Sequence, residues 1–182
     1  MARVPYLDVS DLSPENQDLL KRPIWLNRAL AHSPDALRSM NELAGFIRHK
    51  STLNGRLREL AILQIGWLAR SPYEWSHHVA IGKEFGATDE DIRAIGEETA
   101  GRPTRLDETT KLVLRGAREM NENLAMSDAT YSALEAKLGR EHVIDLIMTI
   151  SFYCAVVRIL ATLQIDVEPD YQKYLSEHPL PA

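Results

Sequence analysis

One histidine and two acidic residues are the side chains of this sequence whose types and spacing suggest chemistry. Glu74 and His78 are four residues apart in a segment with a helical pattern, so their side chains share one helix face. A carboxylate beside an imidazole can orient the ring, select its tautomer and raise its pKa. The pair predicts a unit for general acid–base catalysis, although the same spacing is common on ordinary helix surfaces.

A third candidate, Glu59, lies in the preceding segment, which is apolar on most of its circumference. A buried, unpaired carboxylate is costly, and it therefore needs a partner or a function. The alternative is a structural one, in which Glu59 belongs to a polar stripe together with Arg56 and Arg58. The residues alone leave both interpretations open.

The elements that must position these residues are all predicted to be helices. Apolar residues recur at spacings of three and four, and no useful strand-like alternation is present. Ser33 and Thr88 are expected to cap helices, Ser71-Pro72 to break one, and Gly86 to end one. The expected helices cover about 34–49, 51–70, 72–85, a short stretch from 88, 107–123, 127–138 and 140–163.

The chain is predicted to form a single domain over residues 1–182. Residues 1–22 would be an N-terminal arm with one short helix, and residues 167–182 an irregular C-terminal extension. A length of 182 residues is enough to bury a substantial core without disulfides or a structural metal.

Composition narrows the classes of function. The formal net charge is −5, and Lys and Arg are scattered among Asp and Glu, which argues against a nucleic-acid partner. A single cysteine, Cys154, excludes an intramolecular disulfide and a cysteine-rich metal site. No stretch approaches the roughly 18 uninterrupted apolar residues of a membrane span, and no signal peptide is recognisable. We therefore expect a cytoplasmic protein without a membrane partner.

The residues around the acid–base pair resemble the core motif of the carboxymuconolactone decarboxylase family, which includes the AhpD-type alkylhydroperoxidases. The resemblance covers about 35 residues, and the order of helices on both sides agrees with it. The segments that carry it are Arg58-Glu59-Leu60, a small and apolar run to Ser71, Tyr73-Glu74-Trp75-Ser76-His77-His78, Gly86, and Thr88-Asp89-Glu90-Asp91-Ile92. It implies an AhpD-like helical bundle.

The resemblance also implies roles for single residues. In the peroxidase branch, a glutamate, two cysteines spaced by two residues and a histidine form a proton relay. Glu59 and His78 match the glutamate and the histidine, whereas Ser71 and Glu74 stand at the cysteine positions. Thiol-based peroxide reduction is therefore doubtful. In the decarboxylase branch, the second cysteine is instead a glutamate, which Glu74 matches.

The resemblance thus implies a cofactor-independent lyase of the decarboxylase type, with Glu59, Glu74 and His78 as catalytic residues and a small carboxylate or lactone as substrate. We expect no organic cofactor and no metal. Substrate-binding residues are expected among Ser71, Tyr73, Trp75, Tyr153 and Arg158, with Arg70 as a second candidate for binding a carboxylate.

Two alternative functions remain open, namely a peroxidase-related oxidoreductase and a non-catalytic binding or assembly protein. His77 is expected away from the site, because consecutive helix residues point about 100 degrees apart. Cys154 is expected to be a small buried hydrophobe. Some helices are apolar on more than one face, and similar proteins usually assemble from identical subunits. We therefore expect a homo-oligomer, a trimer or a hexamer.

Overall fold

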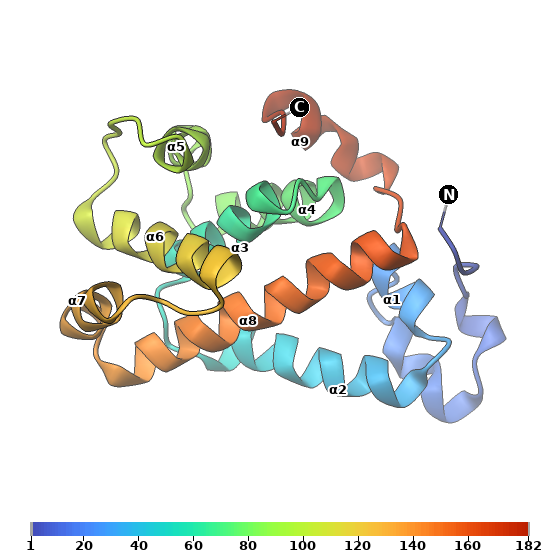
Figure 1. Ribbon diagram of the computed structural model, residues 1–182. Coiled ribbons are helices and arrows are strands. Elements are labelled where there is room, and N and C mark those ends of the chain that lie inside the picture. The colour runs from blue at the N-terminus through green and yellow to red at the C-terminus, as the bar shows by residue number, and fades with distance from the viewer. Residues whose placement is uncertain (1, 182) are drawn as a thin grey trace.

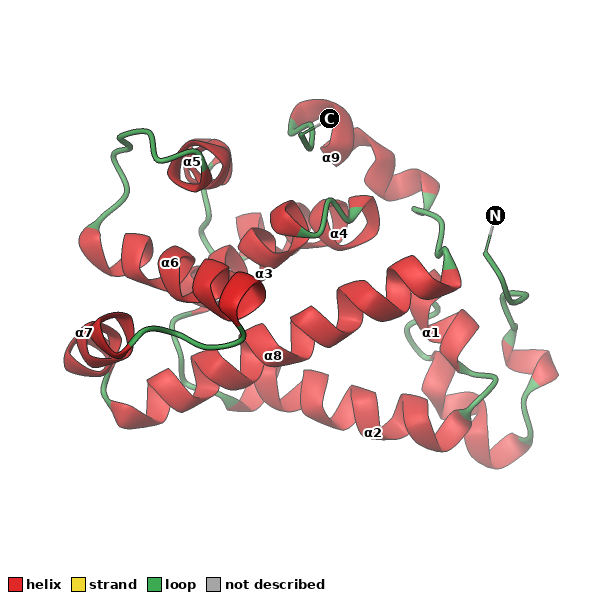
Figure 2. Ribbon diagram, viewed as in Figure 1, coloured by secondary structure: helices red, strands yellow, loops and turns green. Residues whose placement is uncertain are grey.

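The computed structural model describes residues 2–181, which form helices joined by loops without any strand (Figures 1 and 2). The predicted all-α fold is confirmed. The elements are η1 (Val9–Asp11), η2 (Pro14–Leu20), α1 (Trp25–Leu30), α2 (Pro34–Gly45), η3 (Phe46–Lys50), α3 (Gly55–Leu68), α4 (Pro72–Glu84), α5 (Asp89–Thr99), α6 (Glu108–Asn123), α7 (Asp128–Leu138), α8 (Arg140–Leu163), η4 (Pro169–Tyr171) and α9 (Gln172–Glu177).

Helix α3 is the centre of the molecule and packs against α4, α5, α6 and α8 (Figure 1). Every residue from Leu57 to Gly66 is buried, as expected for a helix that is apolar on most of its circumference. Asn54 caps its start, since the side-chain oxygen accepts the N–H of Leu57 at 3.1 Å. One polar residue of this helix, Glu59, is therefore held deep in the protein.

The connection between α3 and α4 is tight. Arg70 adopts a left-handed conformation with φ of 47°, and Ser71 and Pro72 then begin α4 in the expected capping arrangement. The two helices are in contact at Gly66, where a Cβ atom would lie at an ordinary contact distance of 3.4 Å from the backbone nitrogen of Trp75. This close packing brings Glu59 within reach of α4.

The second helix of the chain ends differently from the prediction. The pattern predicts one α-helix to residue 49, but the α-helix ends at Gly45 and the chain continues as a π-helical turn, η3. The N–H of Ser51 accordingly donates to the carbonyl of Phe46, five residues earlier, at 2.9 Å. Ser33 occupies the expected capping position, but its side chain makes no capping hydrogen bond.

The C-terminal segment is more regular than predicted. It contains η4 and α9, and α9 packs on α4. The indole N–H of Trp75 donates to the backbone carbonyl of His178 at 2.7 Å, which ties this segment to the core. The N-terminal arm holds two short 3₁₀ helices, η1 and η2, where one was expected.

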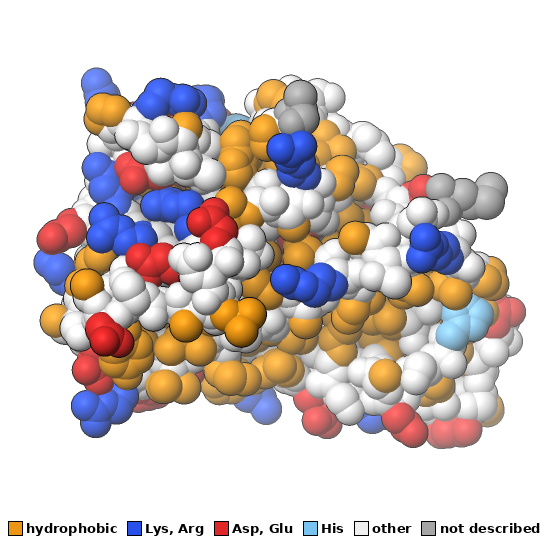
Figure 3. All heavy atoms as spheres, viewed as in Figure 1, with side chains coloured by type: hydrophobic (Ala, Val, Ile, Leu, Met, Phe, Trp, Pro, Cys, Tyr) orange, Lys and Arg blue, Asp and Glu red, His pale blue; other side chains and the backbone are white. Residues whose placement is uncertain are grey.

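Helix α8 is long and apolar enough to cross a membrane by length and composition, although Asp145 and Arg158 interrupt its apolar residues, so it is not the uninterrupted apolar run whose absence was expected. Half of its most apolar window is buried inside the fold, as in the core helix of a folded domain. Its outer face exposes Ile144 and Met148, and Figure 3 shows apolar side chains gathered across the face where α8 lies.

Candidate active site

Glu59, Glu74 and His78 meet between α3 and α4. The Nδ1 atom of His78 lies 2.7 Å from Oε2 of Glu59, and its Nε2 atom lies 3.1 Å from Oε1 of Glu74. All three side chains are at least 94% buried. One imidazole is therefore held between two carboxylates away from bulk solvent, and each ring nitrogen faces a different acid.

The two carboxylates are held differently. Glu59 accepts a hydrogen bond from Nε of the buried Arg58 at 2.9 Å in addition to its contact with His78. The Glu74 oxygen nearest His78 is close to the ring nitrogen but poorly aligned with it, and it has no hydrogen-bond donor among the described residues. Glu59 is thus anchored on two sides, whereas Glu74 keeps an unused acceptor.

These surroundings move the pKa values of the two acids in opposite directions. Burial raises the pKa of Glu74 to about 7, and the nearby Glu59 adds to this rise while His78 and Arg48 oppose it. Burial also acts on Glu59, but the charges and hydrogen bonds of His78 and Arg58 outweigh it and hold that pKa below its usual range. A neutral acid and an ionised acid at one imidazole are suited to proton transfer near neutral pH.

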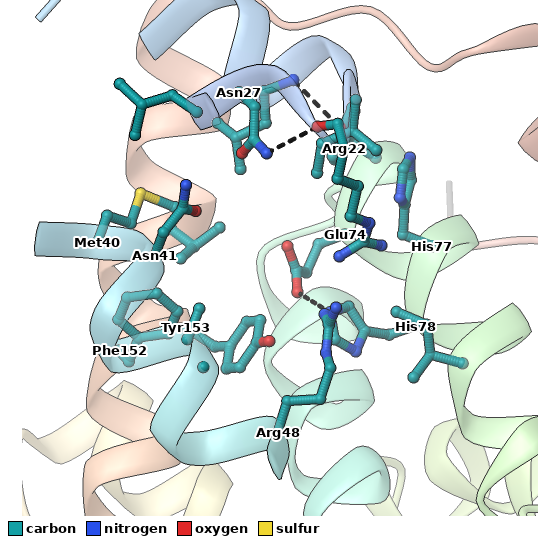
Figure 4. Close-up of a pocket in the computed structure, with 18 of the residues that line it drawn as sticks. Arg22, Asn27, Met40, Asn41, Arg48, Glu74, His77, His78, Phe152 and Tyr153 are labelled. Atoms are coloured by element: carbon teal, nitrogen blue, oxygen red, sulfur yellow. Dashed lines mark hydrogen bonds and ion pairs between the residues drawn. The ribbon is translucent and has the colours of Figure 1, made fainter. Parts of the chain in front are cut away.

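A cavity of about 290 Å³ opens beside Glu74 and His78 (Figure 4). Apolar side chains from four helices form much of its wall, namely Leu26, Met40, Ile81, Phe152 and Val156. Polar side chains gather on the remaining wall and rim, among them Lys21, Arg22, Asn27, Asn41, Arg48 and His49. The volume suits a small organic molecule with one apolar and one polar part.

Tyr153 on α8 closes the cavity opposite α4. Its ring meets the imidazole of His78 edge-on with 4.9 Å between centroids. Burial raises the pKa of its hydroxyl, and the negative charges of Glu74 and Glu59 raise it further, so the group stays protonated. It can therefore donate a hydrogen bond to a molecule in the cavity.

His77, the neighbour of His78, lines the same cavity and belongs to a second network. Its ring is stacked between Tyr73 and Tyr171, with centroid distances of 4.2 and 3.6 Å. Its Nε2 atom lies 2.8 Å from Oε2 of Glu168 in the C-terminal segment. The expectation that His77 would point away from the site is wrong, because the cavity spans two adjacent side-chain rows of α4.

Of the residues expected to bind substrate, Tyr73 and Tyr153 line this cavity and three do not. The hydroxyl of Ser71 caps α4 by accepting the N–H of Glu74 at 3.4 Å. Trp75 packs with Ile92 and Ile95 on the opposite side of α4. Arg158 is exposed and donates to the carbonyl of Cys154. Arg70 is exposed as well and lies outside the cavity.

The arginines at the cavity are Arg22 and Arg48, which the sequence interpretation missed. Arg22 lies in a loop between two short helices, and Arg48 lies in the π-helical turn, so no periodic pattern pointed to either. Residues 2–181 contain no group of three or more His, Cys, Asp or Glu that could hold a metal ion.

The sequence matches a known family over the segment that builds this site. Residues 34–103 match the Carboxymuconolactone decarboxylase family, and they include Arg48, Glu59, Glu74 and His78. This segment of the chain is therefore similar to that family. The chain carries no cysteine pair, since Cys154 is its only cysteine and is half-buried on α8.

Solved structures of similar proteins show the same fold as this chain. A peroxidase-related protein from Ralstonia eutropha JMP134, described as an alkylhydroperoxidase AhpD core, superposes with a TM-score of 0.81 at 15% identity, covering 99% of this chain and 98% of that one. A peroxidase-related protein from Silicibacter sp. TM1040 gives 0.73 at 15% identity, covering 94% and 97%.

A cysteine-to-alanine variant of the debrominase Bmp8, in complex with 2,3,4-tribromopyrrole, gives a TM-score of 0.79 at 18% identity, covering 97% of each chain. At such identities the likeness concerns the fold. No curated protein matches the sequence.

Proposed function

We propose that this protein is an enzyme of the decarboxylase type, which performs acid–base chemistry on a small carboxylate or lactone in the cavity. The observation that carries the proposal is the placement of His78 between two buried carboxylates whose pKa values differ. Burying charged groups is costly to the fold, so such an arrangement supports a functional role for the cluster.

Each member of the cluster has a distinct part in this mechanism. Glu59 accepts Nδ1–H of His78 and fixes the tautomer, which leaves Nε2 facing Glu74. Glu74 carries a proton for part of the time at neutral pH and shares it with Nε2. The pair can therefore deliver a proton to a substrate atom in the cavity and recover one from solvent.

For a decarboxylation, the substrate carboxylate leaves as carbon dioxide, and the electron pair of the broken C–C bond moves into a conjugated carbonyl or lactone. The Glu74–His78 pair then protonates the resulting carbanion or enolate. The Tyr153 hydroxyl stabilises the developing negative charge on oxygen. No organic cofactor is needed when the substrate itself accepts the electrons.

The test is a screen of small lactones and keto acids, including aromatic-catabolite lactones, for release of carbon dioxide. The screen compares wild type with His78→Gln and Glu59→Gln, and the exposed His32→Gln serves as the matched control. Removal of a general acid or base costs about a hundredfold or more in rate. Equal turnover in all four proteins would refute the mechanism, and turnover in none would favour a non-catalytic binding protein.

The peroxidase-related alternative is favoured by the names of two structural neighbours. It requires a thiol, and burial raises the pKa of Cys154 although Arg158 opposes this, which disfavours the reactive thiolate. Peroxide consumption with a dithiol donor, measured for wild type and Cys154→Ser, decides between the two. Strong activity that disappears in the variant would establish the alternative.

We also propose that the protein is cytoplasmic and forms a homo-oligomer, a trimer or a hexamer. The exposed apolar residues Ile144 and Met148 on α8 support self-association, because a second copy could bury them. Light scattering of the purified protein measures the state directly, and a monomer at micromolar concentration would contradict it.

A further inference from the structure

The π-helical turn η3 places one arginine in the wall of the cavity. A π-helical turn is rare, and such turns concentrate at functional sites because they redirect a side chain without ending the helix. Here the turn covers Phe46–Lys50 and carries Arg48, which is half-buried and lines the cavity. Figure 4 shows Arg48 running along the wall beside Tyr153 and His78.

The same turn is linked to the acid–base cluster through its backbone. The carbonyl of Arg48 accepts a hydrogen bond from Nη1 of Arg58 at 3.5 Å, and Arg58 in turn holds Glu59. The backbone of Arg48 is therefore linked, through Arg58, to Glu59.

The guanidinium of Arg48 contacts the Tyr153 hydroxyl but is not paired with a carboxylate among the described residues. The ion pairs of the cluster join Arg58, Glu59, His78 and Glu74, and neither Arg48 nor Arg22 forms an ion pair with a carboxylate within residues 2–181. Arg22 reaches toward Glu74 from the opposite end of the cavity (Figure 4). The cavity thus offers two guanidinium groups near the cluster and an apolar wall of Leu26, Met40, Phe152 and Val156 behind them.

We propose that Arg48 determines the specificity of this cavity by binding an oxyanion of a small planar substrate, most simply a carboxylate. Arg22 would assist at the mouth of the cavity. A planar guanidinium matches a carboxylate in two parallel hydrogen bonds. The apolar body of the substrate would then lie against Phe152, with a reacting carbon beside His78 and Glu74. The proposal rests on the proposed function only in placing the substrate in this cavity.

Binding of two matched pairs of probes tests the proposal without any need for turnover. Benzoate and crotonate carry the carboxylate, and benzamide and crotonamide are their neutral isosteres. Affinities are measured by ligand-observed NMR with wild type, Arg48→Gln, Arg48→Lys and the exposed Arg158→Gln as matched control. Melting curves confirm that each variant is folded.

At least one carboxylate should bind wild type about tenfold or more tightly than its amide. Arg48→Gln should remove this preference, Arg48→Lys should keep part of it because the charge remains without the planar fork, and Arg158→Gln should keep all of it. The loss of the carboxylate preference in Arg48→Gln cannot arise indirectly from a change in the charge of Glu74. Arg48 lowers the pKa of Glu74, so its removal makes that acid more neutral and less repulsive to an anion.

Equal binding of acids and amides to wild type, absence of binding by both acids, or an unchanged preference in Arg48→Gln would overturn the proposal. The outcome is separate from that of the catalytic mechanism. A carboxylate preference that depends on Arg48, in a protein without lyase turnover, would support the binding site and refute the proposed function.

Discussion

Two adjacent histidines on α4 are both buried beside carboxylates, but they differ in the number of acids and in the elements that supply them. His78 lies between two carboxylates of the core, Glu59 and Glu74, and faces the cavity. His77 lies between the rings of Tyr73 and Tyr171, with one carboxylate, Glu168, supplied by the C-terminal segment. In the first network, the Glu74 oxygen nearest His78 has no hydrogen-bond donor among the described residues. The partners of the second network join the C-terminal segment to the core. A buried histidine with a carboxylate partner is thus not sufficient evidence of catalysis.

Glu74 and the second network should also respond to pH with opposite signs, whereas Glu59, whose pKa is lowered, should respond with the same sign as the second network. Glu74 has a raised pKa, so its burial favours folding at low pH, and this contribution is lost as the pH rises through about 7. Burial lowers the pKa of His77 although Glu168 opposes it, and the contacts of Glu168 lower its own pKa against the effect of burial. The second network therefore stabilises the fold at neutral pH, and this stabilisation is lost on acidification.

The largest expected effect is on turnover. His78→Gln should lower kcat by about a hundredfold or more, because it removes the group that exchanges the proton. His77→Gln should change kcat only a few-fold, although the two residues are adjacent and both line the cavity. Steady-state kinetics on a substrate from the screen measures both. A comparable loss in the two variants would mean that the second network takes part in the chemistry.

Glu74→Gln should separate activity from stability. Turnover should fall strongly. The free energy of unfolding at pH 8 should rise by up to about 3 kcal/mol, because a neutral amide replaces a carboxylate that is buried and charged at this pH. The size of the gain follows from the rise of the Glu74 pKa from 4.5 to about 7. The gain should shrink toward pH 4.5, where the wild-type acid is neutral. Urea unfolding across this pH range gives the measurement, and a loss of stability at pH 8 would show that the charge of Glu74 is satisfied in the fold.

Glu168→Gln should produce the converse result. We expect a loss of about 1–3 kcal/mol in stability at pH 7, since a buried hydrogen bond to a charged group is weakened, with little change in kcat. Hydrogen exchange should become faster in η4 and α9, which Glu168 ties to α4. If exchange in this segment stayed at the wild-type rate, the fastening role of the second network would be wrong.

The smallest effect is expected for Arg158→Gln. This exposed side chain bonds to the backbone of its own helix and lies outside the cavity, so stability should change by less than about 0.5 kcal/mol and turnover should not change. The variant sharpens the comparison because it removes an arginine that the sequence alone had suggested for substrate binding. A large rise in KM would place the substrate outside the cavity described above.

Periodicity in the sequence predicted most of the helices, but not the π-helical turn at Phe46–Lys50. The grouping of Glu59 with Glu74 and His78 was implied by the family resemblance and not by periodicity. The prediction for Glu74 and His78 to share a face follows from their spacing, and the structure brings both to Glu59. Whether they are catalytic remains a proposal.

Helix geometry gives a signal against one of the expected substrate-binding residues that lie outside the cavity. Arg158 is five residues from Tyr153 and so faces another side of α8. The one-residue offset of Trp75 from Glu74 gives no such signal, since His77 also stands one residue from His78 and lines the cavity.

Other parts of the site could not be predicted in this way. Arg48 faces the cavity through a π-helical turn, and the sequence Phe46-Ile47-Arg48-His49-Lys50 carries no pattern that distinguishes such a turn from an α-helix. Glu168 and Tyr171 reach His77 across more than ninety positions of the sequence, and only the tertiary fold brings them together. Long-range packing therefore decided what local pattern left open.

The most direct test of the central claim is the titration of the two acids at His78. Protein labelled with ¹³C at the glutamate side-chain carboxyl carbon, with Glu59→Gln and Glu74→Gln used for assignment, reports the ionisation of each group by NMR. The account predicts that Glu74 titrates near pH 7, whereas Glu59 stays ionised to below 4.5. If both acids titrated together near 4.5, the environment would not separate them, and the proposed proton-transfer cluster would be contradicted.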